Sequence, residues 1–115
     1  MSQAGSAGSS GGGGGSGTLV LNYTLVTTTP YVVQPNDEFL GVQTSVMPIT
    51  IELPNAPVIG RVYMIKDISG DALINPITVT TVGGVVDIDG ATSKNMNSVY
   101  QSLQVLFNGT SYLIF

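Results

Sequence analysis

Apolar and polar residues alternate with a period of two along most of this chain, which predicts a succession of β-strands. The clearest example is the run Ile-Thr-Ile-Glu-Leu at 49–53. Prolines and a glycine interrupt the ladder over 54–60, since proline donates no backbone hydrogen bond and glycine tolerates turn geometry. A second strand is expected at 61–68, ending in the turn Ser-Gly-Asp at 69–71.

The remaining segments repeat this pattern. Further strands are expected at 19–26, 31–33, 39–42, 77–82, 85–89, 100–107 and 111–115, whereas 93–97 is weakly patterned. Pro35-Asn36-Asp37 is a turn signal, Gly83-Gly84 predicts a two-residue hairpin, and Asn108-Gly109 is the strongest hairpin signal. No segment of ten or more residues has a 3.6-residue apolar period, so almost no helix is expected. We therefore predict an all-β domain over 18–115, as a small antiparallel sandwich or a β-prism-like domain.

The strand predicted at 61–68 is apolar on both faces. Val62, Met64 and Ile68 share one parity, and Tyr63 and Ile65 share the other. A sheet with one face in water should alternate more cleanly. Either the strand lies inside a sandwich with bulged registers, or both of its faces are covered because subunits pack together. We favour the second explanation and expect a homo-oligomer, with a trimer as its form.

Residues 1–17, MSQAGSAGSSGGGGGSG, are a low-complexity Gly/Ser/Ala segment. One interpretation is a disordered tail or linker, because the segment has nothing apolar to bury. The other is an extended anchoring arm that threads through or docks onto an assembly, since residues without a Cβ atom allow close backbone approach. The segment has neither the basic residues nor the apolar core of a secretory signal.

Charge and composition narrow the possible partners. Charged residues make up 9% of the chain, against about 25% in ordinary globular domains, and neutral polar faces favour close subunit packing. The net charge is −4, and Arg61, Lys66 and Lys94 are the only cationic side chains. We therefore expect no nucleic-acid partner and no anionic membrane surface. No apolar run approaches the ~18 residues that span a bilayer.

Cysteine and histidine are both absent, so disulfides, thiolate chemistry and the usual general base and metal ligand are unavailable. Asp87 and Asp89 beside Gly90 could bind Ca²⁺ or act as the acid and base of glycoside hydrolysis, but we interpret them as turn caps. Asp67 and Asp71 are likewise interpreted as turn residues. Glu52 alternates with an apolar row and is interpreted as a solvated strand residue.

A serine nucleophile lacks its histidine, and no Gly-x-Ser-x-Gly elbow is present. A Ser–Lys pair through Lys66 or Lys94 stays open, although nothing singles it out. The glycines at 11–15 lack the Lys-Ser/Thr ending of a phosphate loop. The sequons at Asn22 and Asn108 are interpreted as accidental matches.

Four tyrosines fall on or beside the predicted strands. They are Tyr31, Tyr63, Tyr100 and Tyr112. One interpretation is that they form a surface that stacks against carbohydrate, and the other is that they occupy core or interface positions. We predict no catalytic, cofactor-binding or metal-binding residue and no cofactor.

Several short motifs resemble a module common in tailed-phage virion proteins, particularly tail fibres, tail tips and related appendages. They are FLGV at 39–42, ITIELP at 49–54, GRVYMIKDISG at 60–70, NPITV at 75–79, IDG at 88–90 and FNGTSY at 107–112. The likeness covers roughly 31–115, and the glycine-rich start is similar to the arms of small virion proteins. The resemblance implies a β-rich, trimeric domain on a virus particle without enzymatic activity. Most such modules lie inside long fibre chains, whereas this module is nearly the whole sequence, which favours a short spike, head fibre or decoration protein.

The leading expectation is thus a non-enzymatic structural protein of the virion, bound to other virion proteins through residues 1–17. The alternative is a receptor- or glycan-binding tip that uses tyrosines and the loops at 95–98 and 108–111. A third hypothesis is a carbohydrate-active enzyme that uses Asp87 and Asp89.

Overall fold

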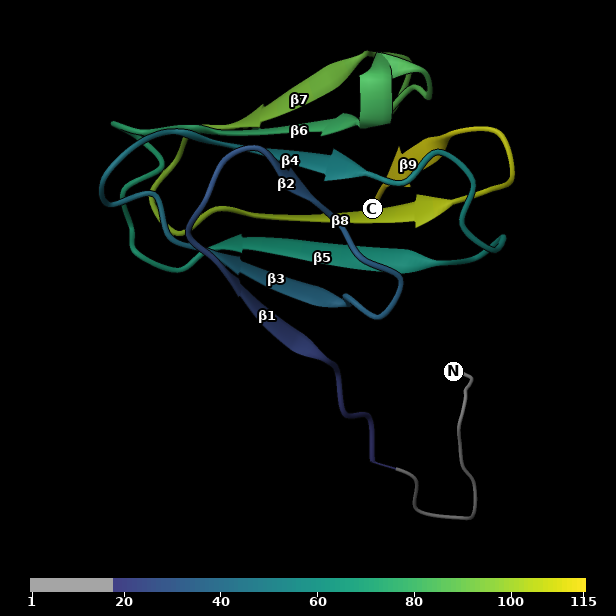
Figure 1. Cartoon of the computed structure of the whole chain (residues 1–115), viewed down its shortest axis with the longest axis horizontal. Helices are drawn as coiled ribbons and strands as arrows, with labels where there is room; N and C mark the ends of the chain where they lie inside the picture. The colour runs from purple at the N-terminus through teal and green to yellow at the C-terminus, as the bar shows by residue number, and fades with distance from the viewer. Residues whose placement is uncertain (1–17) are drawn as a thin grey trace.

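The computed structural model describes residues 18–115, which form two β-sheets packed face to face (Figure 1). The five-stranded sheet has the strand order β1-β3-β5-β8-β9, and the four-stranded sheet has the order β2-β4-β6-β7. The strands are β1 (Tyr23–Val26), β2 (Tyr31–Val32), β3 (Phe39–Val42), β4 (Ile49–Leu53), β5 (Val62–Asp67), β6 (Ile77–Thr81), β7 (Ser93–Met96), β8 (Ser102–Phe107) and β9 (Tyr112–Ile114). Of the two architectures left open by the sequence, these residues adopt the sandwich.

The helix content of the described residues is one 3₁₀ turn, η1 (Val82–Gly84). The prediction of an all-β domain with almost no helix is therefore confirmed for 18–115. None of the described residues belongs to a helix long and apolar enough to cross a lipid bilayer. The arm predicted for residues 1–17 lies outside the described residues.

From β1 to β6 the chain crosses to the opposite sheet at every connection. Strands β1, β3 and β5 consequently lie side by side in one sheet, and β2, β4 and β6 lie side by side in the other. Each pair of consecutive strands (β1 with β2, β3 with β4, β5 with β6) forms one coil, so the chain makes three successive coils. All four pairings within these coils are parallel: β1–β3, β3–β5, β2–β4 and β4–β6. The expected antiparallel sandwich is thus wrong for this part of the chain, and both sheets are mixed.

The physical reason is the spacing of the sheets. Packed sheets lie about 10 Å apart, and the four residues between β1 and β2 can span that gap. A short turn therefore does not require a hairpin. After two crossings the chain returns to its first sheet in its original direction, which makes the new strand parallel to the earlier one.

The C-terminal part is antiparallel as expected. β7 pairs with β6, β8 with β5 and β9 with β8. The hairpin predicted at Asn108-Gly109 is confirmed, with the Asn108 amide donating to the Ser111 carbonyl at 3.0 Å and Gly109 at φ 105°.

Two strand predictions and the two-residue hairpin predicted at Gly83-Gly84 are wrong, and one strand, β7, was not predicted. The strand expected at 85–89 is absent, because the chain leaves the sheet at η1 and Thr81 Oγ1 closes the loop on the backbone of Val86. Instead β6 pairs with β7, which the sequence barely signals because Met96 is its one fully buried residue. The strand expected at 19–26 begins only at Tyr23, and Leu19 and Val20 are exposed.

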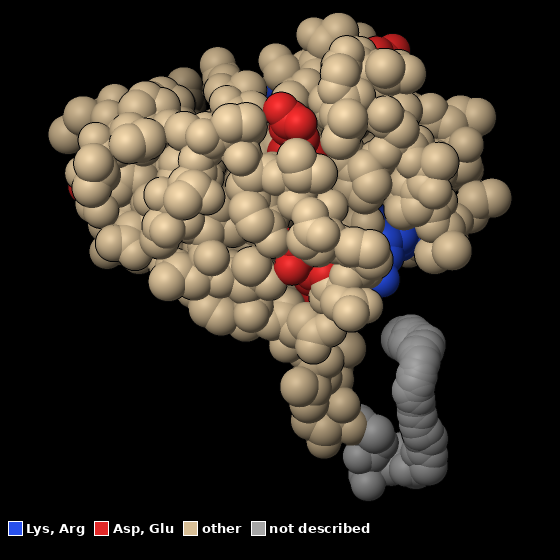
Figure 2. Space-filling view, in the orientation of Figure 1, with Lys and Arg blue, Asp and Glu red and all other residues tan. Residues whose placement is uncertain are grey.

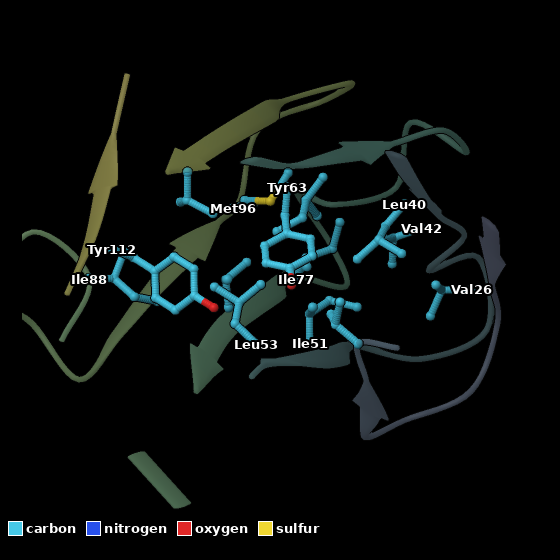
Figure 3. Close-up of a cluster of buried hydrophobic side chains, with 14 of the residues drawn as sticks. Val26, Leu40, Val42, Ile51, Leu53, Tyr63, Ile77, Ile88, Met96 and Tyr112 are labelled. Atoms are coloured by element: carbon cyan, nitrogen blue, oxygen red, sulfur yellow. The ribbon is translucent and has the colours of Figure 1, made fainter. Parts of the chain in front are cut away.

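The core lies between the two sheets (Figure 3). The alternation at 49–53 is confirmed, since Ile49, Ile51 and Leu53 are buried and the two residues between them are not. On β5 the inner residues are Tyr63, Ile65 and Asp67. Each fully buried large side chain contributes about 1.5–3 kcal/mol relative to an exposed one, so these rows provide much of the sandwich's stability.

Candidate functional site

Asp67 ends β5 and is fully buried. Its Oδ1 accepts the Gly70 amide at 3.0 Å, and its Oδ2 accepts the amides of Ala72 at 3.1 Å and Tyr100 at 3.0 Å. Burial alone would raise the pKa of this carboxyl, but the backbone donors outweigh burial and hold the pKa below its usual value. Asp67 thus joins the β5–β6 turn to the β7–β8 turn, and its oxygens are occupied by the chain's own amides.

Asp37 precedes β3 and is also nearly fully buried. Its Oδ1 accepts Thr24 Oγ1 at 2.7 Å, and its Oδ2 accepts Tyr31 Oη at 2.6 Å and the Gln34 amide at 2.8 Å. Burial opposes the charge, yet the donors, Tyr31 first, lower the pKa of Asp37. Burial and the neighbouring carboxylate raise the pKa of Tyr31 to about 12, so the phenol keeps its proton and donates.

Sequence reasoning treated Asp37 only as part of a turn, and the turn signal says nothing about its partners on β1 and β2. Arg61 completes this cluster, with Nη2 donating to the carbonyls of Pro35 at 2.9 Å and Asp37 at 2.7 Å. The guanidinium carbon lies 5.2 Å from the centroid of the Tyr63 ring, within cation–π distance. The cation therefore stabilises the chain's own loop.

The carboxylate pair proposed as a metal or glycosidase site lies in the β6–β7 loop. Asp87 is exposed. Asp89 lies in the turn with φ 48°, but its Oδ1 accepts the Ile114 amide of β9 at 3.1 Å, so its place in a turn is confirmed while its carboxylate binds a distant strand and does not cap the turn. Within residues 18–115, no three potential metal-ligating side chains lie close enough together to hold an ion.

The other candidates hold local structure. The Asp71 carbonyl accepts the amides of Ile74 and Asn75, as expected of a turn residue, and Glu52 lies on the outer face of β4 opposite Thr80. Lys66 Nζ donates to the Tyr100 carbonyl, and Lys94 is half-buried on the edge strand β7.

The four tyrosines do not form a common surface, so a carbohydrate-stacking site built from all of them is wrong. Tyr63 and Tyr112 belong to the core (Figure 3), and Tyr112 Oη donates to the Pro54 carbonyl at 2.6 Å. Tyr31 is tied to Asp37. Of these four, Tyr100 alone is largely exposed, at 54%. Tyr63 and Tyr112 are buried because they occupy inward-facing positions in their strands.

No protein-family model matches the chain, and no curated protein matches it. The motifs that carry the resemblance to virion modules fall on the framework of the fold. FLGV is β3, ITIEL is β4, VYMIKD is β5, and FNGTSY is the turn between β8 and β9 with its flanking residues.

Charged side chains are sparse on the surface. Figure 2 shows a few small acidic and basic areas on an otherwise uncharged face. The outer side of the four-stranded sheet is mostly polar and carries one charged residue, with Thr50, Glu52, Thr78, Thr80, Ser93 and Asn95 beside the apolar Val32. Among the ionisable side chains of the described residues, the two buried carboxylates, Asp37 and Asp67, accept the most hydrogen bonds, and charges on the surface are few.

Proposed function

We propose that this chain is a non-enzymatic structural protein of a virus particle, a short spike, head fibre or decoration protein. Residues 1–17 anchor it to other virion proteins, and the β-domain associates with copies of itself, as a homotrimer. The observation that supports this role is that four charged side chains are engaged in hydrogen bonds within the chain. Asp37, Asp67, Arg61 and Lys66 all hydrogen-bond to the chain itself, so they stabilise loops in place of carrying out chemistry.

Incorporation into particles tests the proposal. In the virus that carries the gene, the full-length chain should copurify with particles through a density gradient, and a chain lacking residues 2–16 should not. The purified deletion variant should keep the circular-dichroism spectrum of the full-length chain, because the strands begin at Tyr23. Absence of the full-length chain from particles contradicts the structural role, and equal incorporation of the deletion variant contradicts the anchor.

Binding of a host-surface glycan is a second candidate, and one observation favours it. The exposed Tyr100 ring lies against Gly70, where an added Cβ would be 2.8 Å from the ring carbon Cζ, so glycine is required for this contact. The Tyr100 amide is held by Asp67. Such a fixed aromatic ring is a suitable stacking surface for a sugar.

The two loops first considered for this role do not meet, because 95–98 precedes β8 and 108–111 follows it at the opposite end. The β7–β8 end with Tyr100 is therefore the one to test. On a glycan array, Tyr100→Ala should lose the binding of the wild-type chain, whereas Val58→Ala, in the exposed β4–β5 loop at the opposite end of β8, should keep it. Failure of the wild-type chain to bind any glycan removes this candidate.

A further inference from the structure

The outer face of the five-stranded sheet is largely apolar, unlike that of the four-stranded sheet. Residues directly opposite in a ladder share a face, and Tyr23, Phe39, Met64 and Gln104 form one row across β1, β3, β5 and β8. Their neighbours along the strands point into the core. We call the following residues the β1–β9 face: Tyr23, Leu25, Phe39, Gly41, Val62, Met64, Lys66, Ser102, Gln104, Leu106 and Leu113.

The opposite side of the sandwich provides an internal comparison. The outer row of the four-stranded sheet runs through Thr50, Thr78 and Asn95. Antiparallel and mixed sheets that face water alternate apolar inside and polar outside. The four-stranded sheet follows this rule at every outer position except Val32, and the five-stranded sheet does not, so the β1–β9 face has the composition of a covered surface.

Two aromatic side chains, Tyr23 and Phe39, cover the β1–β9 face at β1 and β3. The Tyr23 ring lies over Gly41, where an added Cβ would be 2.7 Å from the ring carbon Cε1. The Tyr23 and Phe39 ring centroids are 6.0 Å apart, within the range of aromatic pairs. Glycine at position 41 thus lets the Tyr23 ring approach the backbone of β3. Tyr23 and Leu25 are nevertheless 57% and 52% exposed in the single chain.

Charge indicates which partner fits. Lys66 is the one charged residue of the β1–β9 face, and its ammonium donates to the Tyr100 carbonyl of the same chain. A charged partner would find no free group of opposite charge on this face, because Lys66 is already engaged. Further copies of the chain bring equally apolar faces, so the faces meet with Lys66 as their one source of like-charge repulsion.

We propose that the β1–β9 face is the surface through which copies of this chain pack together. The inference rests on the self-association included in the proposed function and assigns it to one surface. Association of this kind covers the apolar residues that the single chain leaves exposed on β1 and β9. It also explains why the strand at 62–67 is apolar on its outer side as well as its inner side.

Leu25→Glu on the full-length chain tests the assignment, with Thr50→Glu on the four-stranded sheet as the matched control. The mass of each protein is measured by light scattering and sedimentation up to about 100 μM, the range of weak specific complexes. The wild-type chain should be larger than a monomer. Leu25→Glu should raise the dissociation constant at least about 100-fold, because it places a charge in an apolar interface, and Thr50→Glu should leave it unchanged.

Gly41→Ala is a second variant that adds no charge. Its methyl group displaces the exposed Tyr23 ring and should weaken association about 10-fold, with the thermal melt of the domain nearly unchanged. A monomeric wild-type chain overturns the self-association in the proposed function together with this inference. An oligomer that Leu25→Glu leaves intact, or that Thr50→Glu dissociates, overturns the inference alone and leaves self-association standing.

Discussion

Asp67→Ala is expected to lower the free energy of unfolding by about 3–5 kcal/mol, because hydrogen bonds to a charged acceptor contribute about 1.5–3 kcal/mol each and are not fully additive. The substitution leaves the amides of Gly70, Ala72 and Tyr100 without their acceptor, and Ala72 is fully buried. It also separates two turns that belong to different parts of the chain. Urea unfolding of purified protein, followed by circular dichroism, measures the change.

The control for this prediction is Asp87→Ala, which removes an exposed carboxylate. Its effect should stay within about 0.5 kcal/mol, as for most surface substitutions. A loss of less than about 1 kcal/mol in Asp67→Ala would contradict the role of Asp67, since that is the contribution of one ordinary hydrogen bond.

Asp67 also predicts how stability depends on pH. Its folded-state pKa is lowered, so the unfolded chain binds the proton more readily than the folded chain. The stabilisation is therefore complete above the ordinary carboxyl pKa of about 3.9 and is lost as the pH falls through the lower folded value. The folded-state pKa of Asp37 is also lowered, so the stabilisation from Asp37 is likewise lost as the pH falls. Asp67→Ala should consequently show a shallower loss of stability on acidification than the wild-type chain.

Asp37→Ala is expected to cost about 2–4 kcal/mol, because it removes the acceptor of Thr24, Tyr31 and Gln34. The loss should concentrate in the first coil. β1 and β2 are edge strands held by a neighbour on one side only, so few other contacts replace the lost ones. Hydrogen exchange should therefore accelerate most in β1 and β2 and least in β5 and β6.

Tyr31→Phe is the partial counterpart of this change. It removes one donor to Asp37 and keeps the others, so the expected loss is about 1 kcal/mol with the same regional pattern. Uniform acceleration of exchange across all strands in Asp37→Ala, or unchanged exchange in β1 and β2, would contradict the assignment of Asp37 to the first coil.

The candidate site illustrates which features the sequence could predict. The turn role of Asp71 follows from residues close in the chain and is confirmed by its bonds to Ile74 and Asn75, whereas the Asp89 carboxylate binds Ile114, 25 positions away. The contact between Asp67 and Tyr100 joins residues 33 positions apart, and that between Asp37 and Thr24 joins residues 13 apart. Turn patterns carry no information about such distant partners, so the networks around both carboxylates were missed.

Strand positions and inward faces follow from the amino-acid sequence, because alternation of apolar residues is a property of neighbours in the chain. The pattern at 49–53 predicted its buried residues, and Asn108-Gly109 predicted its hairpin. Pairing and direction depended on the folded chain. Tyr23 lies opposite Phe39 in a parallel ladder because short connections cross between sheets, and no local pattern distinguishes a crossing from a hairpin. The apolar outer residues of β5, visible in the sequence as mixed parity, became part of one nearly uncharged face only when five strands were brought side by side.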